Sequence, residues 1–168
     1  MLTRLGATLL LASGLAIVAV PALAVQVSDV VTKNADGTAT YHFSVKTDPG
    51  ETLTPGSDFV TIYNFGGMVE GSAKTPAGWE FSSPEFGKTP TWNGYPAVMP
   101  VDIPVLNNIC WTPTKTIGGG MKVEGFSVTV RSSATTEGEY SAQVTRSEDG
   151  KPSLQAVIGH IATPSYVQ

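Results

Sequence analysis

The sequence predicts an all-β protein, an antiparallel β-sandwich of about seven to nine strands with Greek-key or immunoglobulin-like connections. Three observations predict this fold class. Apolar and polar residues alternate with a period of two through residues 25–168, helical periodicity is almost absent there, and turn signals recur about every ten residues. Half-buried strands of this kind must cover their apolar faces with a second sheet. We therefore expect two packed layers of strands.

The first 24 residues have the anatomy of a secretory signal peptide. One cation, Arg4, precedes an uncharged stretch that runs to Ala24 and ends in an Ala-Leu-Ala pattern. The rival interpretation is an uncleaved membrane anchor, but Gly14 and Pro21 interrupt the helix and no cationic cluster follows. We expect a signal-peptide helix over 1–24, cleavage after Ala24, and a secreted, extracellular or periplasmic product without further membrane contact.

The mature residues 25–168 are enough for one domain with a hydrophobic core, and a single sandwich domain is expected. Removal of Arg4 leaves nine cations against 14 acids, a net charge of −5. An acidic surface does not attract phosphate groups, so nucleic acid is excluded as a partner. The only cysteine, Cys110, cannot form an intramolecular disulfide, and its apolar neighbours predict a buried, unreactive thiol.

The first predicted element of the mature chain is a hairpin. Segments 25–33 and 38–47 flank a turn at 34–37 whose residues tolerate positive φ. In the second segment aromatic residues and valine alternate with polar residues, so His42 is expected to face solvent. Residues 48–57 contain several prolines and glycines and are predicted to form a loop.

Residues 58–82 supply the next two strands. Segment 58–65 is apolar on both faces, which is typical of a strand that is covered on both sides. After a turn at 71–78, segment 79–82 is predicted as a short strand. The aromatic residues of 56–83 occupy strand positions and its glycines occupy turns. We therefore interpret this run as scaffold and not as a binding site.

Residues 84–104 form the longest irregular segment. Five prolines exclude a regular central strand here, and long irregular segments in compact domains often carry function. This segment contains Trp92 and Tyr95, and sugar rings stack on exposed aromatic faces. We therefore take Trp92 and Tyr95 as candidate carbohydrate-binding residues. Trp79 and Trp111, in contrast, are expected in the core because they lie in strands.

Four further strands are predicted after this segment, with glycine-rich or acidic turns between them: 107–114, 123–131, 139–147 and 154–162. The three glycines at 118–120 lack the lysine and the strand-to-helix context of a phosphate-binding loop, so they are interpreted as a turn. His160 lies in an apolar stretch and is expected to be partly buried.

No catalytic residue, metal site or cofactor is predicted. Two histidines and one cysteine are too few for a zinc site without carboxylates, and no nucleophile-elbow motif occurs. Glu137 and Glu139 have no partner acid at a definable separation, so a solvated turn is favoured over a glycosidase pair. A structural calcium at the Asp-Gly turns of Asp36 and Asp149 stays an alternative, although Asp-Gly is also a common hairpin signal.

Several fragments taken together resemble one group of proteins: SDFVTIYNFGGMVEGS, PAGWEFSS, GKTP, NNICWTPT, GFSVTV and GEYSAQVTR. The arrangement, over about residues 41–146, is similar to uncharacterised exported bacterial β domains, often sorted by the PEP-CTERM system and associated with envelope and exopolysaccharide production. Those proteins usually finish with a Val-Pro-Glu-Pro signal, a membrane helix and a basic tail, whereas this sequence finishes at Gln168. The resemblance implies a location and a sandwich fold, and it supplies no catalytic residues.

The leading hypothesis is a non-enzymatic secreted or cell-surface protein with a structural or adhesive role in the envelope or extracellular matrix. The alternative is a carbohydrate-binding module that uses residues 84–104. The expected partners are extracellular polysaccharide or other surface proteins. An enzyme of unfamiliar type would require buried, converging polar groups in the folded protein.

Overall fold

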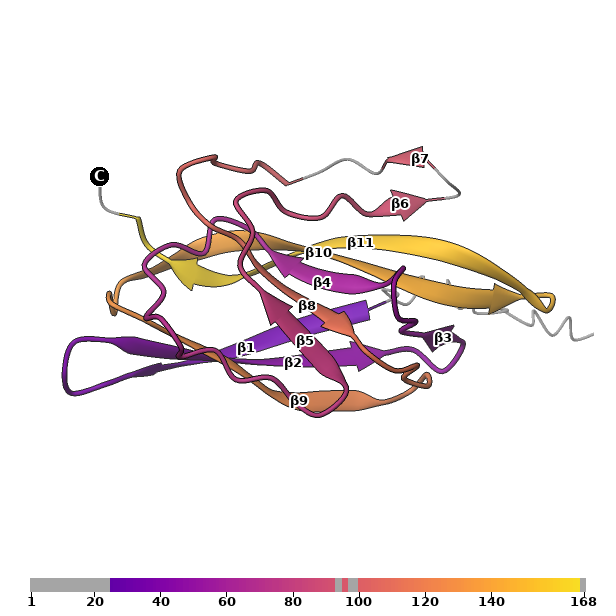
Figure 1. Ribbon diagram of the computed structural model, residues 1–168, viewed down its shortest axis with the longest axis horizontal. Helices are drawn as coiled ribbons and strands as arrows, with labels where there is room; N and C mark the ends of the chain where they lie inside the picture. The colour runs from indigo at the N-terminus through magenta and orange to yellow at the C-terminus, as the bar shows by residue number, and fades with distance from the viewer. Residues whose placement is uncertain (1–24, 93–94, 97–99, 167–168) are drawn as a thin grey trace, which may run out of the picture.

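The computed structural model describes residues 25–92, 95–96 and 100–166, and all regular elements in these ranges are β-strands. The expected signal segment 1–24 lies outside the described residues. Two antiparallel sheets pack around an aromatic core, which confirms the predicted β-sandwich (Figure 1). Within the described ranges, no helix is long and apolar enough to cross a membrane.

The smaller sheet consists of three strands, each paired with the next in this order: β1 (Val25–Lys33), β2 (Ala39–Thr47) and β9 (Lys122–Val130). β1 and β2 form the predicted hairpin, with Lys33 opposite Ala39 beside the turn. Asp36 accepts hydrogen bonds from the backbone N and Oγ1 of Thr38, and these bonds lower the pKa of the Asp36 carboxyl. Gly37 supplies the positive φ, 85°, that the turn requires.

The larger sheet consists of six strands: β3 (Glu51–Thr52), β4 (Phe59–Ile62), β5 (Trp79–Ser82), β8 (Ile109–Pro113), β10 (Thr135–Glu148) and β11 (Lys151–Pro164). Their main order is β11-β10-β4-β8-β5, and β3 pairs with β10. Two further strands, β6 (Thr91–Trp92) and β7 (Tyr95–Pro96), form a separate ribbon.

Three short strands and the ends of the last hairpin were not predicted. β3, β6 and β7 are two residues long, too short to show a period-two pattern. β10 and β11 extend beyond the predicted segments because their cross-strand pairing continues to both ends of the hairpin, past the alternating apolar positions.

The core between the two sheets is built from aromatic side chains. The buried Trp111 of β8 contacts three aromatic rings, at centroid distances of 5.3–5.7 Å: Phe43, Phe81 and Phe126. The ring of Trp79 packs edge-on against Phe126 at 5.0 Å. Trp79 and Trp111 are therefore core residues, as the sequence predicted. Large aromatic side chains contribute most of the burial energy in such a core.

The described residues of the proline-rich segment, 84–92, 95–96 and 100–104, form a third layer on the outer face of the larger sheet (Figure 1). Tyr63, which follows β4, donates a hydrogen bond from its hydroxyl to Lys88 O at 2.9 Å. Cys110 lies under this layer, fully buried, and burial raises the pKa of its thiol. Cys110 is thus buried as predicted, and β4, whose four residues are all buried, is covered on both sides as predicted.

Glu51 of β3 is a fully buried carboxylate. Its Oε2 accepts a hydrogen bond from Asp48 N at 3.1 Å. Its Oε1 lies 3.4 Å from Nη2 of Arg146, within ion-pair distance but without a hydrogen bond. Burial raises the pKa of the Glu51 carboxyl, and the Asp48 N–H and the Arg146 charge only partly oppose this effect. The protonated form of Glu51 is therefore favoured by folding.

This buried carboxylate predicts a stability that falls as the pH rises. The pKa of Glu51 is higher in the folded than in the unfolded chain, so stability is lost as pH rises from the unfolded pKa, about 4.3, through the raised folded value. Glu51→Gln is expected to flatten this decline, measured as the free energy of urea unfolding at several pH values. The remaining decline belongs partly to Asp58, whose pKa is also raised by burial.

The matched control for this measurement is Glu70→Gln, which neutralises an exposed carboxylate. It should keep the wild-type pH profile. If the free energy of unfolding falls with pH as steeply in Glu51→Gln as in Glu70→Gln, the pKa of Glu51 does not differ between the folded and the unfolded chain.

Candidate functional site

One buried asparagine holds both ends of the proline-rich segment. The side chain of Asn108, fully buried just before β8, accepts a hydrogen bond through Oδ1 from Asn64 N at 2.8 Å. Its Nδ2 donates to Glu85 O and to Oδ1 of Asp102, both at 3.0 Å. Because residue 85 lies at the start of the segment and residue 102 at its end, Asn108 joins the two.

Asp102 and Asn64 complete this network. Asp102 Oδ2 accepts a hydrogen bond from Gly87 N at 2.7 Å. The amide of Asn64 donates to Val101 O and accepts from Ile103 N, both at 2.7 Å. Asn64 has φ of 54°, a left-handed conformation that asparagine tolerates better than most residues. The backbone on both sides of Asp102 is therefore fixed against the larger sheet.

The middle of the segment is attached to β10. Oε1 of the buried Gln143 accepts hydrogen bonds from Thr91 N at 2.7 Å and from Thr91 Oγ1 at 3.0 Å. Thr91 is followed in β6 by Trp92, and the ribbon pairs Trp92 directly with Tyr95 of β7. The structure thus places the two predicted carbohydrate-binding residues opposite each other, while their side chains lie outside the part of the chain that is described.

The same segment and the residue after it present large apolar side chains to solvent. Four of them are 41–76% exposed, and we call them the apolar ledge: Phe86, Val101, Ile103 and Val105. The bond between Asp102 and Gly87 N brings the two stretches that carry these side chains together. Clustered exposed apolar side chains often mark contact surfaces.

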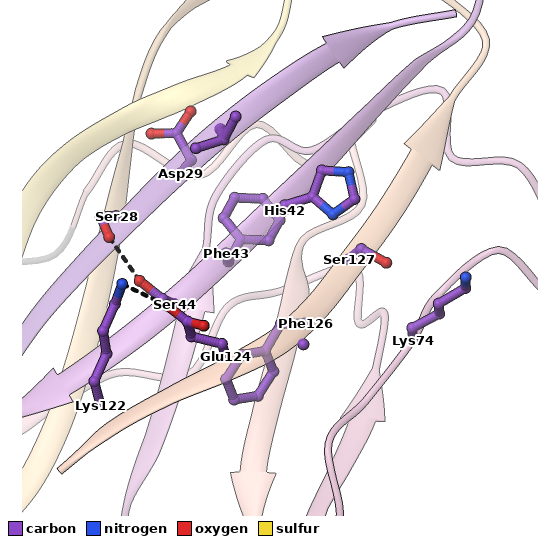
Figure 2. A pocket seen from close by; sticks show the side chains of 12 residues that line it. Ser28, Asp29, His42, Phe43, Ser44, Lys74, Lys122, Glu124, Phe126 and Ser127 are labelled. Atoms are coloured by element: carbon purple, nitrogen blue, oxygen red, sulfur yellow. Dashed lines mark hydrogen bonds and ion pairs between the residues drawn. The ribbon is translucent and has the colours of Figure 1, made fainter.

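A second candidate site is a groove of about 390 Å³ on the outer face of the smaller sheet (Figure 2). Four cross-strand neighbours form a row across it, one from each adjacent strand or segment: Val30, His42, Ser127 and Lys74. Lys74 belongs to the stretch beside β9, where Lys74 N donates to Ser127 O at 2.8 Å and Ser127 N donates to Lys74 O at 3.1 Å. His42 is exposed, as the alternation predicted.

A β-bulge shapes one end of the groove. The register between β2 and β9 shifts beside Ser44, so that Glu124 and Gly125 face this one residue. Gly125 has φ of 97°, which side chains other than glycine rarely adopt. The Oγ atoms of Ser44 and Ser28 are hydrogen-bonded at 2.7 Å, and Lys122 forms an ion pair with Glu124. This end of the groove is therefore formed by two serine hydroxyl groups and by the ion pair of Lys122 with Glu124.

The structure corrects the expectation for His160. Its side chain is 69% exposed, and its Nδ1 lies 3.6 Å from Oε1 of Glu137, whose side chain is 79% exposed. The prediction of partial burial was wrong because the strand alternates: Ile161 is buried while His160 points outward, opposite Glu139. The depression at this position is shallow and open, and ion pairs this exposed contribute little.

The remaining candidates are the carboxylates considered as metal ligands. Among the described residues, no group of three or more His, Cys, Asp and Glu side chains is arranged to hold a metal ion. Asp36 is bonded within its own turn, and Asp149 occupies a left-handed turn position with φ of 50°. Hairpin formation therefore explains both Asp-Gly pairs.

Sequence reasoning missed the Asn108 network and the groove. The signal for the first is weak: two asparagines directly before an apolar strand. The groove has no local signal, because its four row residues come from four separate segments.

A comparison with protein-family models finds no match for this chain, and a comparison with curated proteins finds none either. The resemblance to domains sorted by the PEP-CTERM system therefore stays a prediction. The functional argument depends on the apolar ledge, the aromatic ribbon and the groove.

Proposed function

We propose that this protein is a non-enzymatic secreted or cell-surface β-sandwich with a structural or adhesive role in the envelope or extracellular matrix. The observation that carries the proposal is the apolar ledge on a backbone fixed by Asn108, Asn64 and Asp102. A contact surface that is already ordered loses little conformational entropy when a partner binds. The signal-peptide pattern of residues 1–24 supports a location outside the cytoplasm.

Retention of the protein at the cell surface tests this role. The double variant Phe86→Ser and Val101→Ser removes half of the ledge without changing buried residues. We expect the wild type to stay with the washed cell-surface and matrix fraction, and most of the double variant to move into the medium. The reason is that apolar contact area, about 25 cal/mol per Å², is lost to water.

Met121→Ser is the matched control, because Met121 is also exposed and apolar but lies in the turn before β9. It should be retained like the wild type. Equal retention of the double variant would contradict an adhesive role of the ledge. Recovery of an intact Met1 form in membranes, from mass analysis of the N-terminus, would contradict export.

The alternative function is carbohydrate binding by the ribbon of β6 and β7. The observation that favours it is the direct pairing of Trp92 with Tyr95 on a ribbon that Gln143 attaches to β10. Sugar binding by the wild type that is lost in a Trp92→Ala variant would favour this alternative over the adhesive role.

A further inference from the structure

We propose that the groove on the outer face of the smaller sheet binds an acidic saccharide. In this proposal Lys74 pairs with a carboxylate of the sugar, and Ser127 and His42 form hydrogen bonds with its ring hydroxyls. The inference rests on the proposed extracellular role, and it assigns a ligand class to a surface separate from the apolar ledge.

Ser127 is the first reason. Its side chain is only 5% exposed yet lines the groove, where Figure 2 shows its hydroxyl between His42 and Lys74. The backbone N and O of Ser127 are both bonded to Lys74, and no hydrogen bond joins its hydroxyl to another of the described residues. Its Oγ still reaches solvent, so a ligand that enters the groove can exchange hydrogen bonds with it.

The shape of the polar surface is the second reason. Neighbouring strands lie about 4.8 Å apart, so the row from Val30 to Lys74 spans about 14 Å. Such a row suits an extended chain of sugar rings and not a single small ion. Hydroxyl groups continue on both sides of it, at Ser44 beside the bulge and at Thr40, whose Oγ1 lies 3.0 Å from Oγ1 of Thr129.

The row also combines polar and apolar contacts in the way a sugar needs. The imidazole of His42 and the hydroxyl of Ser127 can exchange hydrogen bonds with the hydroxyl groups of a sugar ring. At the end of the row, Val30 is largely exposed and offers an apolar surface to the C–H face of a ring. Binding sites for small molecules commonly combine apolar walls with a few polar groups of this kind.

Charge favours an acidic over a neutral saccharide. Lys122 is already paired with Glu124, whereas Lys74 has no ion-pair partner among the described residues. Asp29 also borders the groove, but its carboxylate accepts a hydrogen bond from Ala162 N of β11 at 3.5 Å, on the other side of β1. Exposed ion pairs contribute at most about 1 kcal/mol, so Lys74 selects among ligands more than it adds affinity.

Calorimetric titration of the exported protein with tetragalacturonic acid and with its methyl ester tests the proposal. The two sugars have the same rings, and only the first carries carboxylates. We expect tighter binding of the acid, and a roughly three- to tenfold weaker affinity for both sugars in Ser127→Ala. Lys74→Gln should bind the ester like the wild type but lose the preference for the acid.

Lys151→Gln is the control for net charge, because Lys151 is exposed at the start of β11, next to the turn that joins β10 to β11. It should bind both sugars like the wild type. Unfolding measurements should show Ser127→Ala to be as stable as the wild type, because the hydroxyl that it removes has no partner within the described chain.

Three outcomes would overturn the groove assignment: equal affinity of the wild type for both sugars, unchanged affinity in Ser127→Ala, or no binding at all. Binding lost in Trp92→Ala and kept in Ser127→Ala would place the sugar on the ribbon instead. None of these outcomes affects the retention assay with Phe86→Ser and Val101→Ser. The failure of the groove and the failure of the adhesive role are therefore distinguishable.

Discussion

Trp111→Ala is expected to lower the free energy of unfolding by about 3–5 kcal/mol, a large fraction of the roughly 5–15 kcal/mol available to a typical domain. Trp111 is buried between the sheets, and its ring contacts Phe43, Phe81 and Phe126. Truncation removes all three contacts and leaves a cavity that β-strands on both sides cannot close. Urea unfolding followed by circular dichroism would measure the loss.

Two further variants separate lost packing from other effects. Trp111→Phe keeps an aromatic ring and removes an indole N–H that has no hydrogen-bond partner among the described residues, so it should cost less than the alanine variant. Phe86→Ala removes an exposed ring and should change stability by no more than about 0.5 kcal/mol. If Trp111→Ala were as mild as Phe86→Ala, the aromatic core would not be what stabilises the sandwich.

Asn108→Ala is expected to cost about 2–4 kcal/mol and to loosen the third layer. The substitution leaves Asn64 N without its acceptor and removes the bonds to Glu85 O and Asp102. Both ends of the proline-rich segment then lose a shared anchor. Amide hydrogen exchange at residues 85–87 and 101–103 should accelerate, in addition to the fall in unfolding free energy.

The neighbouring asparagine provides the control. Asn107 is exposed, and its backbone carbonyl accepts a hydrogen bond from Phe65 N that a substitution to alanine preserves. Asn107→Ala should therefore stay within about 0.5 kcal/mol of the wild type. If amide hydrogen exchange in Asn108→Ala accelerates elsewhere in the domain but not at residues 85–87 and 101–103, the network does not hold the proline-rich segment.

The parts of the fold that the sequence predicted are those that local chemistry decides. The hairpin of β1 and β2 follows from period-two alternation on both sides of a turn with Asp36 and Gly37. The double-sided apolar pattern of β4 correctly indicated a cover on both faces. Trp111 and Cys110 were placed in buried positions for the same reason: each lies in an apolar strand.

The candidate sites depend on contacts that no local pattern reports. Asn108 binds residues 44, 23 and 6 positions away in the chain. The groove requires the register of β2 against β9, which a single bulge at Gly125 shifts. Because a shift of one residue exchanges the two faces of a strand, the row beside His42 follows only from the folded register.

Two errors have identifiable local causes. The ribbon of β6 and β7 is too short to show a period-two pattern, although the sequence places Asn-Gly, a strong hairpin signal, between Trp92 and Tyr95. Proline is compatible with such a ribbon at its edge, and Pro96 is the last residue of β7. The exposure of His160 follows from the alternation of its strand, which the average apolarity of the stretch conceals.

The third layer also protects the protein from the chemistry of the compartment in which it is expected to work. Outside the cytoplasm thiols are readily oxidised, and a lone reactive cysteine would cross-link two copies of the chain. Cys110 is fully buried and its pKa is raised, so the thiolate that such a reaction requires is scarce. If the protein works outside the cytoplasm, as proposed, this burial would keep the Cys110 sulfur atom reduced.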